Sequence, residues 1–531
     1  MRHASSRVLP STVALATVVV VAGCATTGST PSATTAGSTG PATTTVRTTI
    51  DVPAGFDPAK AASLPDFLLA RMSFDTLVRK DTGGIVGGLA TTWTTTPTSA
   101  TFTLRTDATC SDGTKVTPAM VKKSLDRLAA PATAASTAVS VFGPGNVPKV
   151  TADDPGNSVT VTVERPWDLV GGLTIASSGI VCPAGLADEK GLAAGTVKGA
   201  GSGPYTLTAQ QSGATYSYAL RTDYTAWPKR ATTPAGEVPK TVEYVVSLDP
   251  TATANLVKNG QLDIAKINAE SIPRVEGDGS AKAAVFPFSD FYLVFNERPG
   301  SPFTDPALRK AVAQVIDRAA FEKVTSKGTG ETLTYLASKN TPCWDGDTSF
   351  VIPTDPAAAK KVLAGKKIRL LGPQIVGTNG AGNAYLQEVL RAAGADVELQ
   401  NTDVGTWISK VFGAQDSWDV TVFADLNFIG SLASPLPVCG GPAVEAGGGN
   451  LGAVKNPAAD AAFAQGLAAT DEQGRCAGLR AAHQALVKAA DTVPLVNDAF
   501  IYAVRPGFDV SMLGGALDDP TFRITNAGAS S

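Results

Sequence analysis

Between residues 366 and 423 the chain alternates short apolar runs with amphipathic stretches, and this alternation constrains the fold more than any other feature. Strand-like runs and helical stretches follow one another in the order 368–371, 385–393, 397–399, 406–412 and 420–423. A β-α-β-α-β order implies a mostly parallel sheet with helices covering it. Ligands of such sheets gather near the carboxyl ends of the strands, so the loop that starts at Ala424 is the place where a binding site is expected.

The amino-terminal part carries different signals, a half-buried strand followed by a helix. Residues 100–105 alternate polar and apolar side chains with period two, as such a strand does. Thr117 is a suitable N-cap residue, and Pro118 follows at the first helical position. The apolar residues that would share one face of this helix are Val121, Leu125 and Leu128.

Several segments along the chain resemble, in the expected order, the family 5 extracytoplasmic solute-binding proteins, which serve peptide and nickel ABC importers. The segments that carry the resemblance are Phe74-Asp75-Thr76-Leu77, Phe102-Thr103-Leu104-Arg105, Ser111-Asp112-Gly113-Thr114, Gly201-Ser202-Gly203-Pro204-Tyr205, Leu262-Asp263-Ile264-Ala265 and Phe303-Thr304-Asp305-Pro306-Ala307-Leu308-Arg309. They span nearly the whole chain beyond its amino-terminal leader, which makes their joint occurrence more specific than any single motif.

The resemblance implies an α/β, two-lobed fold of the periplasmic-binding-protein type (class II, cluster C), with an extra subdomain in the first lobe. Two crossing strands would join the lobes, and closure of the lobes would enclose a solute. The expected parts are a leader at 1–23, a lipidated cysteine and flexible linker at 24–49, first-lobe segments at 50–74, 196–287 and 492–531, the extra subdomain at 75–195 and the second lobe at 288–491.

By position, the resemblance places the ligand contacts on three segments. The first lobe would contribute Ser63, Leu64 and Asp66, and the second lobe the segment from Ala424 to Phe428 with Asp425 and Asn427. Phe291 and Tyr292 begin a strand, and since successive strand residues alternate faces, one ring is expected at the cleft and the other in the core.

The second-lobe segment departs from the pattern of the oligopeptide-binding members. In an ungapped alignment from Trp418-Asp419-Val420, the acid that holds a peptide's amino group falls at Phe428, and a nearby arginine falls at Val422. Both charged capture residues are therefore absent. Asp425 could take over the amine-binding role and Asn427 could bond amides, or each could be a turn residue.

The first residues have the build of a secretory leader. Arg2 and Arg7 precede a short apolar run that ends at Val21-Ala22-Gly23-Cys24, and these four residues resemble the lipobox of bacterial lipoproteins. Cys24 would then be the lipidated first residue of the mature protein, with a plain secreted protein as the alternative. Residues 25–49 are rich in Thr, Ser, Ala, Gly and Pro, with Arg47 as the only charge, and are interpreted as a flexible tether.

Composition excludes several classes of function. The formal net charge is -3, without a basic stripe for nucleic acid, and the histidines are His3, in the leader, and His483. A hydrolase triad would have to depend on His483 alone, and no nucleophile motif accompanies it. Few imidazoles and thiolates are available for nickel, so no metal and no cofactor are expected.

Five cysteines follow Cys24, and outside the cytoplasm they are expected to form disulfides. The pairing favoured here joins Cys110 to Cys182 and Cys439 to Cys476 and leaves Cys343 free, although spacing alone does not fix connectivity.

The sequence therefore predicts a monomeric binding lipoprotein, not an enzyme, on the outer face of the bacterial cell membrane. It would pass a peptide or peptide-like solute to an ABC permease and its ATPase. The alternative is a lipoprotein of the same fold that senses a solute, or acts as a scaffold, without importing it.

Overall fold

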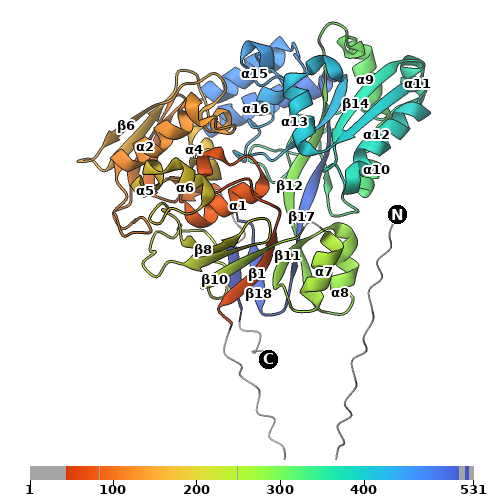
Figure 1. The fold of residues 1–531 in the computed structure, drawn as a ribbon. Helices are drawn as coiled ribbons and strands as arrows, with labels where there is room; N and C mark the ends of the chain where they lie inside the picture. The colour runs from red at the N-terminus through yellow and green to blue at the C-terminus, as the bar shows by residue number, and fades with distance from the viewer. Residues whose placement is uncertain (1–42, 83, 248, 514–520, 526–531) are drawn as a thin grey trace, which may run out of the picture. The chain divides into compact units, whose positions relative to one another are not determined.

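The computed structural model describes residues 43–82, 84–247, 249–513 and 521–525 (Figure 1). The predicted leader, Cys24 and the tether up to residue 42 lie outside these residues. Within the described ranges, no helix has the length and apolar character needed to cross a membrane.

The tether was predicted to extend too far, because residues 45–49 form a strand. The sheet that contains it has the order β1 (Thr45–Ile50), β10 (Thr241–Val246), β9 (Thr215–Leu220), β8 (Tyr205–Gln211). Alternate residues of β1 are buried, among them Val46 and Thr48, and β1 pairs in parallel with β10. Arg47, expected to be a lone charge on the tether, donates to the Asp263 carboxylate from Nε at 3.0 Å and from Nη2 at 2.7 Å. Long-range pairing thus orders a segment whose composition suggested disorder.

A second antiparallel sheet belongs to the amino-terminal half of the chain. Its order is β4 (Ala90–Thr96), β5 (Ser99–Leu104), β7 (Ser158–Thr162), β6 (Lys149–Asp153). Helix α2 (Pro118–Ala129) packs on it, and the Thr117 hydroxyl accepts a hydrogen bond from the Met120 amide as the predicted N-cap. Val121, Leu125 and Leu128 are buried, which confirms the predicted apolar face. Nearby, β2 (Val78–Asp81) and β3 (Gly84–Gly87) form a hairpin.

The largest sheet confirms the β-α-β-α-β prediction. Its order is β11 (Ile264–Ile267), β17 (Thr492–Val504), β12 (Lys282–Phe295), β16 (Val420–Asp425), β14 (Lys367–Pro373), β15 (Asp396–Thr402), with β13 (Glu331–Thr332) beside β17. Strand β14 is parallel to both β15 and β16, and the helices α12 (Ala381–Ala392) and α13 (Val404–Gly413) are the crossovers. Figure 1 shows these helices around β14.

Two long strands, β12 and β17, connect separate hydrophobic cores. Phe286 on β12 and Phe500 and Tyr502 on β17 pack with the β1 sheet, while Phe291 on β12 and Leu495 on β17 pack in the core beneath α9 to α12. For the description of the cavity, the first lobe is the part built on the β1 and β4 sheets, and the second lobe is residues 288–491.

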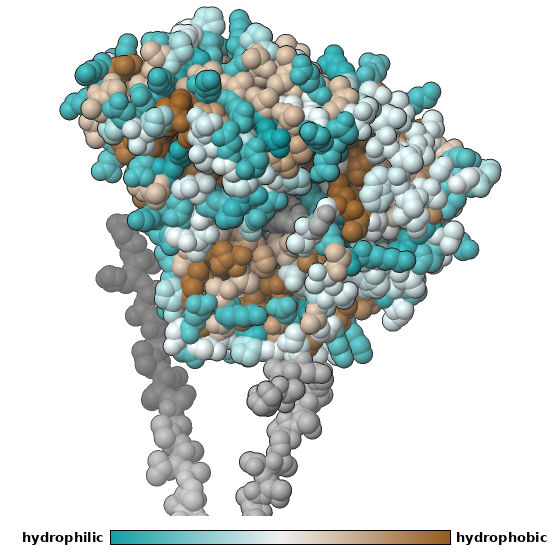
Figure 2. Space-filling view, turned by 180° about the vertical axis from the view of Figure 1, so that it is seen from behind, coloured by the Kyte–Doolittle hydropathy of each residue, from teal (hydrophilic) through white to brown (hydrophobic). Residues whose placement is uncertain are grey.

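The remaining helices surround these sheets. Their bounds are α1 (Leu64–Ser73), α3 (Ala138–Phe142), α4 (Leu169–Gly172), α5 (Pro183–Ala187), α6 (Glu189–Ala194), α7 (Pro250–Lys258), α8 (Ile272–Glu276), α9 (Pro306–Val315), α10 (Arg318–Thr325), α11 (Pro356–Leu363), α14 (Leu436–Cys439), α15 (Pro457–Ala468) and α16 (Glu472–Lys488). A last hairpin joins β18 (Phe508–Ser511) and β19 (Thr521–Ile524). Figure 2 shows hydrophobic residues in separate patches on one face, with hydrophilic residues between them.

The disulfides correct half of the predicted pairing. Cys110 bonds to Cys182 as predicted, but Cys476 bonds to Cys343, and Cys439 is free and buried. Cys476 lies on α16 next to the loop that holds Cys343, and Arg480 on the same helix donates to the Cys343 carbonyl. Cys439 is in the core, where burial raises the pKa of its thiol. The predicted partner of Cys476 was therefore wrong.

Candidate binding site

A cavity of about 1360 Å³ lies where the two lobes and the crossing strands meet. First-lobe residues of the β2–β3 hairpin and the β4–β5 turn form one wall, and the second-lobe loop 426–431 and the start of α16 form the opposite wall. The crossing strands contribute Asp290 from β12 and Asn497 from β17, and the loop from Ser338 to Trp344 completes the lining. The volume exceeds the roughly 300–1,000 Å³ of ordinary small-ligand pockets, so a solute of several residues or rings fits within it.

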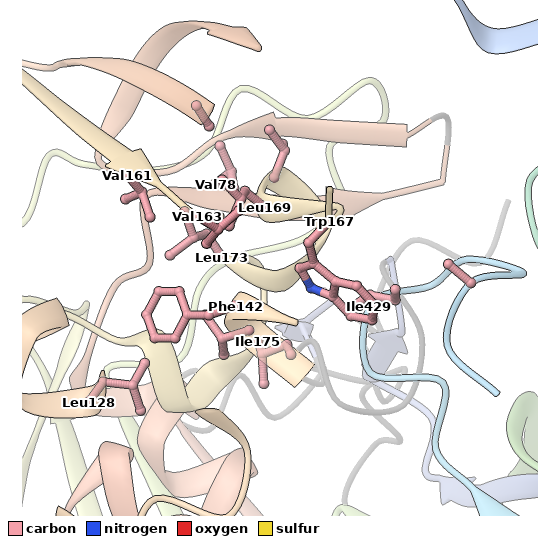
Figure 3. Close-up of a cluster of buried hydrophobic side chains, with 14 of the residues drawn as sticks. Val78, Leu128, Phe142, Val161, Val163, Trp167, Leu169, Leu173, Ile175 and Ile429 are labelled. Carbon is pink, nitrogen blue, oxygen red and sulfur yellow. The ribbon is translucent and has the colours of Figure 1, made fainter. Parts of the chain in front are cut away.

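Side chains from the two lobes touch around the cavity. The Arg475 guanidinium on α16 donates to the Asp168 carboxylate at 2.5 Å, and the Lys80 ammonium donates to the Asn427 carbonyl at 3.3 Å. Trp167, next to Asp168, lies beside Ile429 of the second lobe, as Figure 3 shows. These contacts join walls that come from distant parts of the chain, so the described conformation is one in which the lobes are in contact.

Asp290 and Asn497 form a polar pair at the crossing strands. They face each other in the antiparallel ladder, between two irregularities of the β12–β17 register. The Asn497 amide donates to Asp290 Oδ1 at 2.9 Å, and both residues are buried. Burial raises the pKa of Asp290 well above its usual range, the Asn497 hydrogen bond opposes this effect, and the nearby Asp425 adds to it. The cavity therefore contains a buried carboxyl whose hydrogen bonds come from one side-chain amide and the Ser338 backbone.

The predicted second-lobe segment contributes two cavity residues, Leu426 and Asn427, while Ala424, Asp425 and Phe428 serve the structure. Asp425 accepts hydrogen bonds from the Asn427 amide at 2.7 Å and the Tyr292 hydroxyl at 3.3 Å, and burial raises its pKa to about 6. Ala424 packs against the second-lobe core, and Phe428 stacks edge-on against Phe67 at 5.4 Å. Asp425 thus has the geometry of the turn residue considered as an alternative.

The predicted first-lobe contacts lie away from the cavity lining. Asp66 accepts hydrogen bonds from the amides of Ala54, Ala62 and Ser63, and from the Ser63 hydroxyl. Ser63 and Asp66 thereby hold the start of α1, and Leu64 packs at the edge of the core beside the β1 sheet. The sequence pattern of a helix start, an N-cap serine with an acid three residues later, explains their position.

Phe291 and Tyr292 occupy opposite faces of β12, as alternation requires, but both are buried and neither lines the cavity. Phe291 belongs to the core under α9 to α12, and Tyr292 to the core on the other face of the sheet. The sheet is covered on both sides here, so both rings are core residues.

Sequence reasoning missed most of the residues that line the cavity. The missed side chains with distinctive chemistry are Lys80, Trp93, Trp167, Asp168, Asp290, Trp344, Arg475 and Asn497. One signal was available, because Ser289 and Asp290 together interrupt the apolar and aromatic run of residues 283–295. The tryptophans sit in separate segments that only the fold brings together.

Comparison with known proteins decides the family. The model for "Bacterial extracellular solute-binding proteins, family 5 Middle" matches residues 84–432. The chain belongs to this family. Family 5 solute-binding proteins bind their solutes and are not enzymes, and the two-lobed α/β fold is that of the cluster C periplasmic binding proteins.

Three relatives indicate the range of solutes within similar structures. A substrate-binding protein from Microbacterium hydrocarbonoxydans, solved with 4-hydroxybenzoate hydrazide, is 49% identical, with a TM-score of 0.81 over 91% of this chain and 100% of that one. The periplasmic murein peptide-binding protein MppA of Escherichia coli is 27% identical over 488 residues, 85% of this chain and 87% of that protein. AgaA of A. tumefaciens R10, solved with agropinic acid, shares the fold at 22% identity, with a TM-score of 0.75 over 91% of this chain and 99% of that one.

The histidine of this family 5 protein is part of the core. Both His483 ring nitrogens are engaged with the backbone, Nδ1 accepting from the Leu336 amide at 3.2 Å and Nε2 contacting the Leu432 carbonyl at 2.7 Å. Burial lowers the pKa of His483 to about 4. Among the described residues, no group of three or more His, Cys, Asp or Glu side chains is arranged to hold a metal ion.

Proposed function

We propose that this family 5 protein captures a peptide or peptide-like small solute outside the cell and delivers it to an ABC permease with a cytoplasmic ATPase. The observation that carries the proposal is the cavity of about 1360 Å³, whose walls come from both lobes and whose floor comes from the crossing strands. Such strands can flex as a hinge, so the lobes open for entry and close around the solute.

The second-lobe geometry favours a small solute over a long peptide held by its charged ends. Val422 and Phe428 stand where the oligopeptide-binding pattern has an arginine and an acid. Val422 is fully buried and Phe428 packs on Phe67, so neither position offers a charge to a peptide terminus. The three relatives support a broad list of candidates, and we include a murein-type tripeptide, 4-hydroxybenzoate hydrazide and agropinic acid.

We further propose that Cys24 carries the lipid anchor and that the residues after it tether the binding body to the outer face of the membrane. Two or more acyl chains give stable anchorage, whereas one gives only reversible binding. Labelling cells with a fatty-acid analogue and finding the label on the wild type but not on Cys24→Ala would support the anchor, and label on both proteins would overturn it.

A thermal-shift screen tests solute capture. At least one of the three candidate compounds, or a small molecule that co-purifies with the protein, should stabilise it by about 2.7 kcal/mol at a hundredfold excess over Kd. Thr95→Trp, which adds bulk to the cavity wall beside Trp93, should abolish the shift. Thr94→Trp, on the opposite face of β4, is the matched control and should keep it.

Two further outcomes decide whether the protein captures a solute and whether it imports that solute or only senses it. If no compound shifts the unfolding temperature and no small molecule co-purifies, solute capture is wrong. If a solute binds but cells show no uptake that depends on this protein, the protein senses the solute rather than importing it.

A further inference from the structure

The charged side chains that line the cavity differ in how many hydrogen-bond and ion-pair partners the protein gives them. In the described residues the lining includes the acids Asp81, Asp168, Asp290, Asp471 and Glu472 and the bases Lys80 and Arg475. Both bases already contact protein groups, Arg475 the Asp168 carboxylate and Lys80 the Asn427 carbonyl. The cavity therefore has an excess of acidic groups, and the question is which of them is available to a solute.

Four of the five acids are satisfied by the protein or by water. Asp81 accepts from the Ala231 and Thr82 amides, and Asp168 pairs with Arg475. Asp471 caps α16 through the Gly474 amide, and both it and Glu472 are exposed. Asp290 differs from them, because it is only 3% exposed and the donors that reach it are two uncharged groups, the Asn497 side-chain amide and the Ser338 backbone.

Among the described residues, the groups with the largest effect on the charge of Asp290 include no cation. The groups that act on its charge are Asn497, Asp425 and Glu331, together with a backbone hydrogen bond at Ser338. A buried carboxylate is stabilised when a further N–H donor or a positive charge reaches it, because such a partner compensates for the hydration that the carboxylate has lost. A bound solute that displaces water from the closed cavity can bring such a donor.

Aromatic side chains line the same cavity as this carboxyl. Phe286 and Phe288 precede Asp290 on β12 and line the same cavity, and Trp93, Trp167 and Trp344 contribute from three other segments. Rings of this kind bury flat apolar surface and pack edge-on or offset against another ring. The cavity thus combines aromatic walls with one buried acceptor.

We infer that the cavity selects solutes with an aromatic body and a nitrogen head group that donates hydrogen bonds, such as a hydrazide or a primary amine, and that Asp290 receives this head group. The inference rests on the proposed function and specifies the solute class of the same site. Asn497 positions the carboxyl through Oδ1, so that the remaining acceptor capacity serves the solute.

Calorimetric titration with matched probes tests this assignment. The first pair is 4-hydroxybenzoate hydrazide and 4-hydroxybenzoate, which share the ring and differ in the head group, and the second is phenylalaninamide and N-acetylphenylalanine. In at least one pair, the wild type should bind the nitrogen compound at least tenfold more tightly than its acid counterpart. Acetohydrazide, which lacks the ring, should bind more weakly than the aromatic hydrazide.

Asp290→Asn keeps an oxygen for the Asn497 amide but presents a donor in place of the second acceptor. It should weaken the nitrogen probe by about 10- to 100-fold, the range for loss of a charge-assisted hydrogen bond. The matched control is Asp498→Asn, which removes a half-buried acid of the same strand pair that accepts a hydrogen bond from the Ser326 hydroxyl and does not line the cavity. This control should change the affinity less than twofold.

The outcomes separate this inference from the proposed function. If another solute binds while both acid probes bind as tightly as the nitrogen probes, or if Asp290→Asn keeps wild-type affinity, the inference is overturned and solute capture stands. Equal losses in Asp290→Asn and Asp498→Asn would also overturn it, because they would show a general charge effect. If no solute of any kind binds, the proposed function fails as well.

Discussion

Two buried carboxyl groups, Asp66 at the start of α1 and Asp290 on the crossing strands, show how a carboxyl that serves the structure differs from one that can bind a solute. Asp66 is 4% exposed and Asp290 is 3% exposed, so burial does not distinguish them. Asp66 accepts hydrogen bonds from three backbone amides and one hydroxyl, whereas Asp290 accepts one from the Asn497 side-chain amide and one from the Ser338 backbone. The number of donors that the chain itself supplies decides whether a buried acid has capacity left for a solute.

The sharpest test of this comparison is Asp66→Ala. Removing the carboxylate leaves three backbone amides without their acceptor at a buried helix start, so the free energy of unfolding should fall by about 3–5 kcal/mol. Urea denaturation at pH 7.5 measures the loss. Asp290→Asn, studied in the same way without solute, should lose less than 1 kcal/mol, because it keeps the Asn497 hydrogen bond and removes an unfavourably buried charge. A loss below 1 kcal/mol for Asp66→Ala would contradict the structural role.

The roles of Asp66 and Asp290 also show which site properties can be predicted from the sequence alone. A serine followed three residues later by an acid is a local helix-start signal, so the role of Asp66 was readable from Ser63 to Asp66, although position in the family pattern suggested a ligand contact instead. The role of Asp290 depends on Asn497, which is 207 residues away in sequence. No local sequence pattern predicts the pairing of Asp290 with Asn497.

Other parts of the fold follow the same division. The alternation in residues 366–423 and the capped helix after Thr117 involve neighbours in sequence, and both predictions were confirmed. The Cys343–Cys476 bond and the ordering of residues 45–49 depend on contacts across more than a hundred residues, and both predictions were wrong. Local periodicity determines where helices and strands form, whereas the cavity forms where elements that are distant in sequence meet.

Asp425 is a third buried carboxyl, and the pH dependence of stability extends the comparison of Asp66 and Asp290 to it. It has two donors but no ion pair, and its pKa rises to about 6 from an ordinary value of 3.8, chiefly through burial. The folded state therefore holds the proton more tightly than the unfolded state, so the stability that protonation provides is lost as the pH rises from about 4 through 6. By pH 7.5 the loss attributable to Asp425 amounts to about 3 kcal/mol.

Asp425→Asn should remove this dependence. Relative to the wild type, the variant should gain up to about 3 kcal/mol in the free energy of unfolding between pH 4 and pH 7.5, as urea titrations across that range would show. His483 contributes the opposite slope, because its lowered pKa favours folding above its ordinary pKa and loses that contribution as the pH falls toward 4. It is present in both proteins and cancels in the difference. Parallel pH profiles for wild type and variant would refute the assignment.

The smallest effect is expected at Asp168, a cavity acid whose partner is the Arg475 guanidinium. Its carboxylate meets Arg475 across the lobes at 2.5 Å, and about a third of the Arg475 side chain is exposed. Partly solvated ion pairs contribute about 0–1 kcal/mol, so Arg475→Gln should change the free energy of unfolding by less than 1 kcal/mol. Because the pair joins the two lobes, its loss should instead speed solute release by up to about fivefold, that is, by the same 1 kcal/mol. Stopped-flow dissociation of a bound solute measures this rate.

The matched control for that experiment is Arg298→Gln, which breaks an arginine–carboxylate pair with Glu445 within the second lobe at 2.7 Å. This variant should release solute at the wild-type rate. Asp168→Asn combined with Arg475→Gln should release it no faster than Arg475→Gln alone, since both substitutions break one contact. Additive rates, or equal acceleration by Arg298→Gln, would mean that the pair does not hold the lobes together. In that case the apolar packing of Trp167 beside Ile429 would be left to restrain opening at this edge of the cavity.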